Sequence, residues 1–94
     1  VEDHGNVRVP DRTLLAAAAG GRAFLPAITE VCAELAAFTA GAVRNGATPL
    51  VLGGDHSLGA GSVAGVATAL AERGEALGLL WLDAHADIHT ADSS

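Results

Sequence analysis

Three potential metal ligands stand at every second position near the end of this sequence. They are Asp83, His85 and Asp87, with only alanines between them. Successive side chains of an extended chain point to opposite faces, so this spacing puts two carboxylates and an imidazole on one side. Any one of them alone would suit a turn or a helix cap, but a concentrated group of acids and histidines needs a cation once it is partly buried. The pattern therefore favours a metal site.

Distance limits the kind of metal site that this spacing can form. Alternate residues of a straight strand lie about 6.6 Å apart, whereas two ligands of one ion are at most about 4 Å apart. Either the chain curls where the strand ends, or the ligands are shared between two ions held roughly 3.5 to 4 Å apart. The spacing is compatible with both arrangements.

The elements around these ligands alternate between helix and strand. Two short apolar runs, 49–52 and 79–82, are typical of strands that are covered on both faces. The periodicity predicts a helix over 26–45 and another over 57–73, and an alanine-rich run favours a short helix over 11–21. A helical crossover of about 18 residues makes the two strands parallel. The sequence thus predicts an α/β fold.

Individual residues mark the ends of the two longer helices. Pro26 lies near the start of the first helix and Arg44 near its end, as the helix dipole favours, and Gly46 supplies the stop. Ser57 is expected to cap the second helix, and Gly74 to end it. The apolar stripe expected on the first helix consists of Ile28, Val31, Leu35, Phe38 and Ala42.

The second helix contains three glycines, at positions 59, 61 and 65. Each weakens a helix by about 1 kcal/mol relative to alanine. This cost implies that the helix packs closely against a neighbouring element.

Both predicted strands end in potential ligands. In open parallel sheets, ligands bind beyond the carboxyl ends of the strands. His56 follows the first strand and Asp83 ends the second, so His56 becomes a fourth candidate ligand if the strands are neighbours. Asp55 beside it is either a hydrogen-bond acceptor for a ligand or a turn carboxylate.

Two of these motifs together resemble the paired signature of the ureohydrolases, the family of arginase, agmatinase and their relatives. The first is Gly-Gly-Asp-His-Ser over 53–57, and the second is Asp-Ala-His-Ala-Asp over 83–87. A weaker likeness over 3–7, read as Asp-His-Gly-Asn-Val, extends the resemblance over nearly the whole chain. It implies a three-layer α/β/α fold with a parallel sheet, of which residues 1–94 form a partial single domain, the N-terminal part.

The resemblance also implies a binuclear manganese site. His56, Asp83 and Asp87 would bind one Mn²⁺ ion, and His85 would bind the other, with Asp83 bridging the two. Carboxylates and imidazoles without thiolates suit such a hard ion, and two ions together activate water as a nucleophile near neutral pH. The implied reaction is hydrolysis of a guanidine-type C–N bond in a small-molecule substrate, with release of urea.

The residues after the second motif bear on the substrate. Ile88-His89-Thr90 resembles the arginase branch more than agmatinase, which favours hydrolysis of arginine to ornithine and urea. Arginases usually have Asn where this chain has His89, at a position that contacts the amino-acid end of the substrate. Agmatine, guanidino acids and formiminoglutamate therefore stay open as substrates.

Composition excludes several other classes of function. A net charge of -6 argues against nucleic acid or anionic lipid as a partner, and no uninterrupted run approaches the roughly 18 apolar residues of a membrane span.

Cys32 is the only cysteine of the sequence, and we expect it to be a small buried residue. No internal disulfide can therefore form, and a reducing compartment is the simpler assumption. We expect a cytoplasmic protein that forms a homo-oligomer when full length.

Two readings from other classes compete with the hydrolase. Residues 59–64 match the G-x-G-x-x-A fingerprint of a dinucleotide-binding domain, with Asp83 as its acid. However, its first glycine should follow the strand directly, and here the turn over 53–58 has intervened. A non-catalytic structural piece is the third possibility. For the hydrolase, we expect the 94 residues alone to be inactive.

Overall fold

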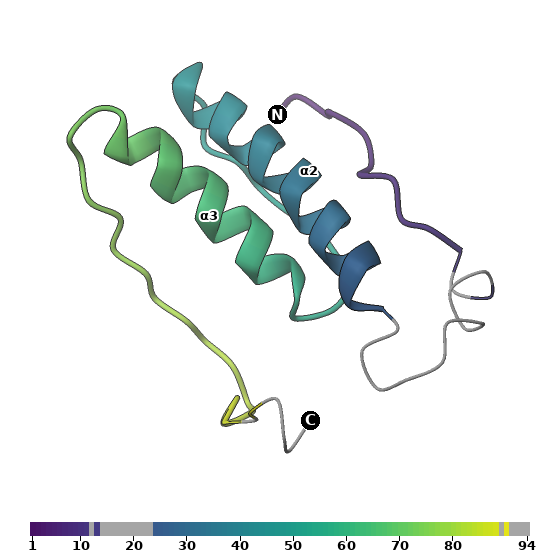
Figure 1. Cartoon of the computed structure of the whole chain (residues 1–94). Coiled ribbons are helices and arrows are strands. Elements are labelled where there is room, and N and C mark those ends of the chain that lie inside the picture. Colours follow the sequence, from purple (N-terminus) through teal and green to yellow (C-terminus); the bar gives the residue numbers. More distant parts are fainter. Residues whose placement is uncertain (12, 14–23, 89, 91–94) are drawn as a thin grey trace.

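A pair of packed helices forms the centre of the computed structural model, which describes residues 1–11, 13, 24–88 and 90. Helix α2 spans Leu25–Arg44 and helix α3 spans Leu58–Ala71. The two lie side by side (Figure 1). Both helices predicted from the sequence are thereby confirmed, while the short helix expected over 11–21 falls largely outside the described residues.

Glycines of α3 allow the backbones of the two helices to approach closely, as their presence in the helix predicts. A Cβ atom added at Gly61 would lie 2.6 Å from the carbonyl oxygen of Cys32 in α2, and one added at Gly65 would collide with Ala36 and Thr39. The Thr39 hydroxyl is buried between the helices and donates a hydrogen bond to the Ser62 carbonyl, at 3.3 Å. The contact between α2 and α3 is therefore one that only small residues of α3 permit.

The buried face of α2 differs from the predicted apolar stripe. Val31 and Leu35 are buried as expected, but Ile28 and Phe38 are exposed by 37% and 45%. The close approach of the glycines favours small side chains in the contact, which turns the face with Ala27, Thr39 and Ala40 toward the core. A prediction from hydrophobicity alone therefore misplaced part of the stripe. The two helix backbones lie so close together that small side chains, and not the most hydrophobic ones, fill the contact.

The ends of the helices follow local backbone chemistry. Gly46 and Gly74 have φ values of 75° and 72°, a left-handed conformation that glycine adopts at little cost, and each follows a helix end as predicted. At the start of α3, Ser57 occupies the capping position but its side chain makes no capping hydrogen bond. Its hydroxyl donates instead to the carboxylate of Asp55, so the predicted serine cap is wrong.

The predicted parallel sheet is absent from the part of the chain that the structure describes. Residues 47–52 pass behind the helices and residues 75–83 run beside α3, but no backbone hydrogen bond joins the two segments (Figure 1). The prediction that their side chains are covered on both faces is also wrong, since Leu52, Leu80 and Leu82 are at least 83% exposed. A strand, unlike a helix, needs a neighbouring segment to satisfy its backbone, and neither segment provides this for the other.

Both extended segments nevertheless face the same hollow on the helix pair. This cleft has a volume of about 240 Å³ and is mostly apolar. Its lining comes from the helices (Thr39, Ser62, Val63 and Val66) and from the extended segments (Pro49, Val51, Leu77 and Leu79). The described residues thus form one helical layer with two unpaired segments beside it, in place of the three layers predicted.

Helix α2 is long and apolar enough to cross a membrane by length and composition alone. Its most apolar stretch has a mean hydropathy of 1.2. The central helix of a soluble protein passes the same test, and α2 packs against α3. The length and hydropathy of α2 are therefore only weak support for a membrane span. Mean hydropathy identifies this helix although it contains no long uninterrupted apolar run.

Candidate metal centre

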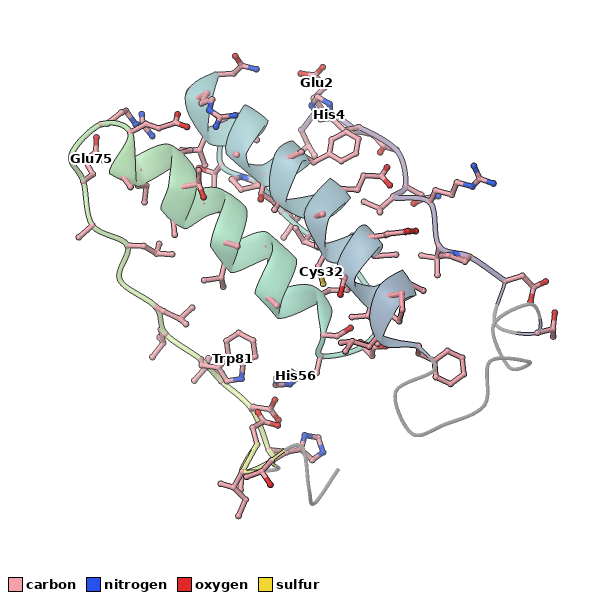
Figure 2. The ribbon with its side chains drawn as sticks, in the orientation of Figure 1. Glu2, His4, Cys32, His56, Glu75 and Trp81 are labelled. Carbon is pink, nitrogen blue, oxygen red and sulfur yellow. The ribbon has the colours of Figure 1, made fainter. Side chains whose placement is uncertain are left out.

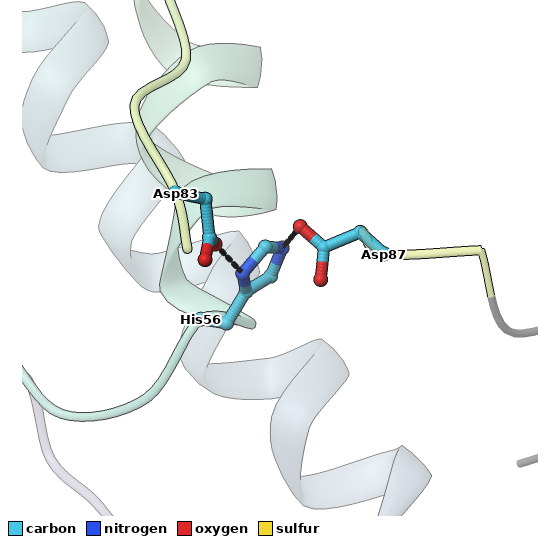
Figure 3. Close-up of side chains that lie close together, drawn as sticks. All are labelled: His56, Asp83 and Asp87. Carbon is cyan, nitrogen blue, oxygen red and sulfur yellow. Dashed lines mark hydrogen bonds and ion pairs between the residues drawn. The ribbon is translucent and has the colours of Figure 1, made fainter. Parts of the chain in front are cut away.

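Two distant parts of the chain bring three of the predicted ligands together. His56 lies in the turn before α3, whereas Asp83 and Asp87 lie at the end of the second extended segment. The imidazole stands between the two carboxylates, with Nδ1 3.0 Å from Oδ2 of Asp83 and Nε2 3.6 Å from Oδ2 of Asp87 (Figure 3). One potential ligand atom from each residue lies within 4.8 Å of the others. The three side chains thus converge on a space that a single ion could occupy.

The backbone curls where the second extended segment ends, which is one of the two arrangements that the spacing allowed. A bend at residues 84 and 85 follows Asp83, and Asp87 has a φ of 50°. Aspartate is among the few residues apart from glycine that enter this left-handed region readily. The curl brings Asp87 to the same imidazole as Asp83, over a shorter span than a straight strand allows.

The two oxygens of Asp83 have different partners. Oδ2 faces His56, while Oδ1 accepts a hydrogen bond from the backbone N–H of His85 at 2.8 Å and lies 2.7 Å from Nδ1 of the same residue. The pKa of Asp83 is lowered, first by the backbone N–H of His85, then by the His85 imidazole, with smaller contributions from His56 and Trp81. Asp83 is therefore a carboxylate at neutral pH, the form that binds a metal.

Of the two remaining predicted site residues, His85 stands apart from the group of three. The His85 side chain is 80% exposed, and its imidazole lies beside Oδ1 of Asp83, the oxygen that does not face His56. It is therefore not part of the group formed by His56, Asp83 and Asp87. His89 lies outside the described residues. The geometry consequently separates the four predicted metal ligands into a group of three and a single histidine, which share Asp83.

Asp55 stabilises the turn that carries His56. Its Oδ1 accepts hydrogen bonds from the Ser57 hydroxyl and from the backbone N–H of Ser57, the latter at 2.9 Å. The hydroxyl first, and then the backbone N–H, lower the pKa of Asp55. Of its two predicted roles, that of a turn carboxylate is the one observed.

Two residues near the site were missed by the sequence analysis. The Trp81 ring lies 5.0 Å from the His56 imidazole, centroid to centroid (Figure 2). The Cys32 thiol is half-buried, and it donates a hydrogen bond to the Ser57 carbonyl at 3.3 Å, which ties α2 to the turn before α3. The spacing held a signal for Trp81, because it stands two positions before Asp83 and so shares a face with it in an extended chain.

The glycines of the dinucleotide-like motif have a structural explanation. Gly59 and Gly61 lie inside α3, where they contact Trp81 and the backbone of Cys32. In a dinucleotide-binding domain the first glycine would form the turn before the helix and approach a pyrophosphate. Nothing in this arrangement favours that reading.

Comparisons with known proteins agree with the two motifs. A family model described as the arginase family matches residues 1–94. The curated arginase of Bacillus caldovelox is 47% identical over 70 residues, which are 74% of this chain and 22% of that protein. The arginase of Neurospora crassa is 41% identical over 72% of this chain and 19% of its own length. The arginase of Agrobacterium fabrum is 60% identical over 45% of this chain and 13% of its own length. No solved structure matches. The chain belongs to the arginase family.

Proposed function

We propose that the full-length protein is an arginase-like manganese ureohydrolase, which hydrolyses arginine to ornithine and urea. The observation that carries this proposal is the convergence of His56, Asp83 and Asp87 in a chain of the arginase family. Family membership implies an α/β fold, so the helix pair would cover a sheet built with segments beyond these 94 residues. The matched part is about a fifth of the Bacillus caldovelox arginase, which supports a partial single domain.

The residues present fit a hard divalent ion such as Mn²⁺. The donors are imidazole nitrogens and carboxylate oxygens, and no thiol is among them. His56, Asp83 and Asp87 would hold one ion, and His85 with the other oxygen of Asp83 would hold a second. The different partners of the two Asp83 oxygens support this bridging role. When bound, such a pair of ions supplies a water-derived nucleophile near neutral pH.

The chain's own residues would hold the ligands in place. The Asp55–Ser57 hydrogen bonds fix the turn that carries His56, and the His85 backbone N–H keeps the Asp83 carboxylate anionic. These contacts act before any substrate arrives. Preorganised ligands of this kind reduce the cost of assembling the site.

The substrate is proposed from the names of the relatives and from one departure in the sequence. The curated relatives compared above are all named arginase. His89, proposed as a substrate-binding residue, differs from the asparagine usual in arginases, and an imidazole differs from an amide in shape and in donor number. Agmatine, guanidino acids and formiminoglutamate are the alternative substrates.

The cellular setting is also a proposal. A single free cysteine suits a reducing compartment, which supports a cytoplasmic protein. The excess of acidic residues supports a small-molecule substrate in place of nucleic acid or a membrane surface. We further propose a homo-oligomer, to be tested by the mass of the full-length protein in solution.

The direct test is a substrate panel assayed with the full-length protein and Mn²⁺. Urea release from arginine and agmatine, and hydrolysis of guanidino acids and formiminoglutamate, would be measured for the wild type and His89→Asn. We expect urea from arginine, with a raised preference for arginine in the variant. Absence of hydrolysis of every substrate by the Mn²⁺-loaded protein would refute the proposed function, and an unchanged preference would remove His89 from the specificity argument.

A further inference from the structure

Trp81 lies at the point where the second extended segment meets the metal-site turn. It is the only tryptophan of the chain and stands on a different segment from His56. The two rings are 5.0 Å apart between centroids, with their planes tilted by 56° (Figure 2). Tilted rings at this separation attract each other beyond simple burial. The indole therefore forms a wall against one side of the imidazole.

The indole is also seated on the first turn of α3. A Cβ atom at Gly59 would lie 3.1 Å from Cζ3 of Trp81 and closer still to Cη2. Any larger residue at position 59 would have to displace the ring. Glycine at this position is thus explained by the indole, since the helix itself would be more stable with alanine.

Few other contacts hold the extended segment to the helices at this point. Among the hydrogen bonds and ion pairs of residues 76–88, those that reach the turn before α3 all involve His56. The His56 side chain is half exposed, so solvent competes for these polar contacts. A ring wall that does not depend on charge would keep the imidazole oriented before an ion binds.

We propose that Trp81 is a positioning residue of the metal centre, whose indole, seated on Gly59, holds the His56 imidazole in register with Asp83 and Asp87. The inference rests on the proposed function only in taking Mn²⁺ as the ion. Loss of residues that orient a ligating histidine typically weakens metal binding 10- to 100-fold.

Variants of the full-length protein separate this role from general stability. Trp81→Leu removes the ring, and Trp81→Phe keeps a ring without the indole N–H. Gly59→Ala displaces the ring but removes no functional group from the site. Gly41→Ala is the matched control, because this helical glycine of α2 has nothing within 4 Å of an added Cβ. The Kd of Mn²⁺ would be measured from the free-ion signal in electron paramagnetic resonance, together with the Tm of each metal-free protein.

We expect Trp81→Leu to bind Mn²⁺ roughly 10- to 100-fold more weakly and Gly59→Ala roughly tenfold more weakly. Trp81→Phe should rescue most of the affinity, and Gly41→Ala should match the wild type. In Gly59→Ala the affinity should fall while the Tm does not, which a purely structural role would not produce. Wild-type affinity in both Gly59→Ala and Trp81→Leu would overturn the proposal; should Trp81→Leu fail to fold, wild-type affinity in Gly59→Ala alone would do so.

The tryptophan also supplies a signal of its own. Bound Mn²⁺ quenches a nearby indole, so the emission that Trp81→Phe lacks should fall as Mn²⁺ fills the site. Absence of quenching in a protein that binds Mn²⁺ would place the ion away from Trp81 and refute the inference. Because both readouts are binding measurements, they remain decisive if the wild type releases no urea, an outcome that would count against the proposed function alone.

Discussion

The helix pair and the two extended segments differ in how completely their backbone groups are hydrogen-bonded and their apolar side chains buried. Helices α2 and α3 form their backbone hydrogen bonds internally and bury Ala40, Val43 and Ala69 in one shared cluster. The extended segments leave backbone groups unpaired and leave Leu52 and Leu80 at least 83% exposed. Local structure is therefore complete where the chain is helical, whereas the extended segments depend on contacts from elsewhere in the full-length protein.

The candidate metal centre lies across this boundary. His56 belongs to the turn that α2 and α3 hold in place, while Asp83 and Asp87 belong to an extended segment. An ion bound by all three would link the better-packed region to the less well-packed one. Substitutions in either region, or in the residues that link them, should therefore have effects of different size.

The largest expected effect comes from isolating the 94 residues. We expect the peptide to release no measurable urea with Mn²⁺ present, since the side chains of His56 and Asp87 are exposed to solvent and the two extended segments have no pairing partner within the described part of the chain. Amide hydrogen exchange should show protection in α2 and α3 but none over 49–52 and 79–82. Protection of both extended segments in the isolated peptide would mean that they pair without the rest of the protein.

The second largest effect is expected from removing the Asp83 carboxylate, which connects the extended segment to His56. In the full-length protein, Asp83→Asn should lower Mn²⁺ occupancy at both positions, with affinity reduced at least about 100-fold, because one carboxylate serves two ions. His85→Ala should mainly empty one position. Elemental analysis of the purified variants measures both, and retention of two ions by Asp83→Asn would rule out the bridging assignment.

A smaller effect is expected within the helix pair. Gly61→Ala would place its Cβ 2.6 Å from the Cys32 carbonyl oxygen, and such overpacking should lower the free energy of unfolding by about 1–3 kcal/mol. Gly41→Ala, which meets open space, should raise it by up to about 1 kcal/mol. Urea denaturation of the full-length variants gives both values. Equal effects of the two substitutions would show that the close helix contact is not maintained.

The smallest effect concerns the Arg44–Glu72 ion pair, which joins the ends of the two helices. Nη2 and Oε1 are 2.6 Å apart, and the hydrogen bond from Arg44 lowers the pKa of the exposed Glu72. A lowered folded-state pKa stabilises the protein above the unfolded pKa of about 4.3, and this contribution is lost as the pH falls through the folded value. Glu72→Gln should lower the Tm by about 1 °C at pH 7 and by less at pH 3. A difference that grows toward pH 3 would contradict the sign.

Sequence reasoning succeeded where the determining interactions are local. The spacing of apolar residues, Pro26 and Gly46 defined α2, and the glycines of α3 correctly indicated a close contact. It failed over 49–52 and 79–82. An apolar run indicates that a segment is suited to burial in a sheet, but it does not show which segment would pair with it. The convergence of His56 with Asp83 was anticipated from a sheet that the described residues do not form. Asp87 reaches the same imidazole through the bend after Asp83 and its own left-handed φ.

The contribution of Trp81 could not be predicted from residue type. A tryptophan in an apolar run is normally assigned to the core, and only the three-dimensional structure places its ring against His56 and Gly59. The same holds for Cys32, whose thiol reaches the Ser57 carbonyl across 25 positions of sequence. Contacts between distant segments need the fold before they can be assigned.

The apolar cleft beside α2 and α3 has a consequence for the order of events during synthesis. The helices are complete once residue 71 has left the ribosome, but Leu77 and Leu79, which line the cleft, are made later. Until then the cleft side of α3, with Val63 and Val66, lacks this part of its cover. An ion at the candidate centre could be captured only later still, because Asp83 and Asp87 follow both helices in the chain. A nascent chain that stops between residues 71 and 77 would therefore expose the apolar cleft side of α3 to other chains and would be prone to aggregate.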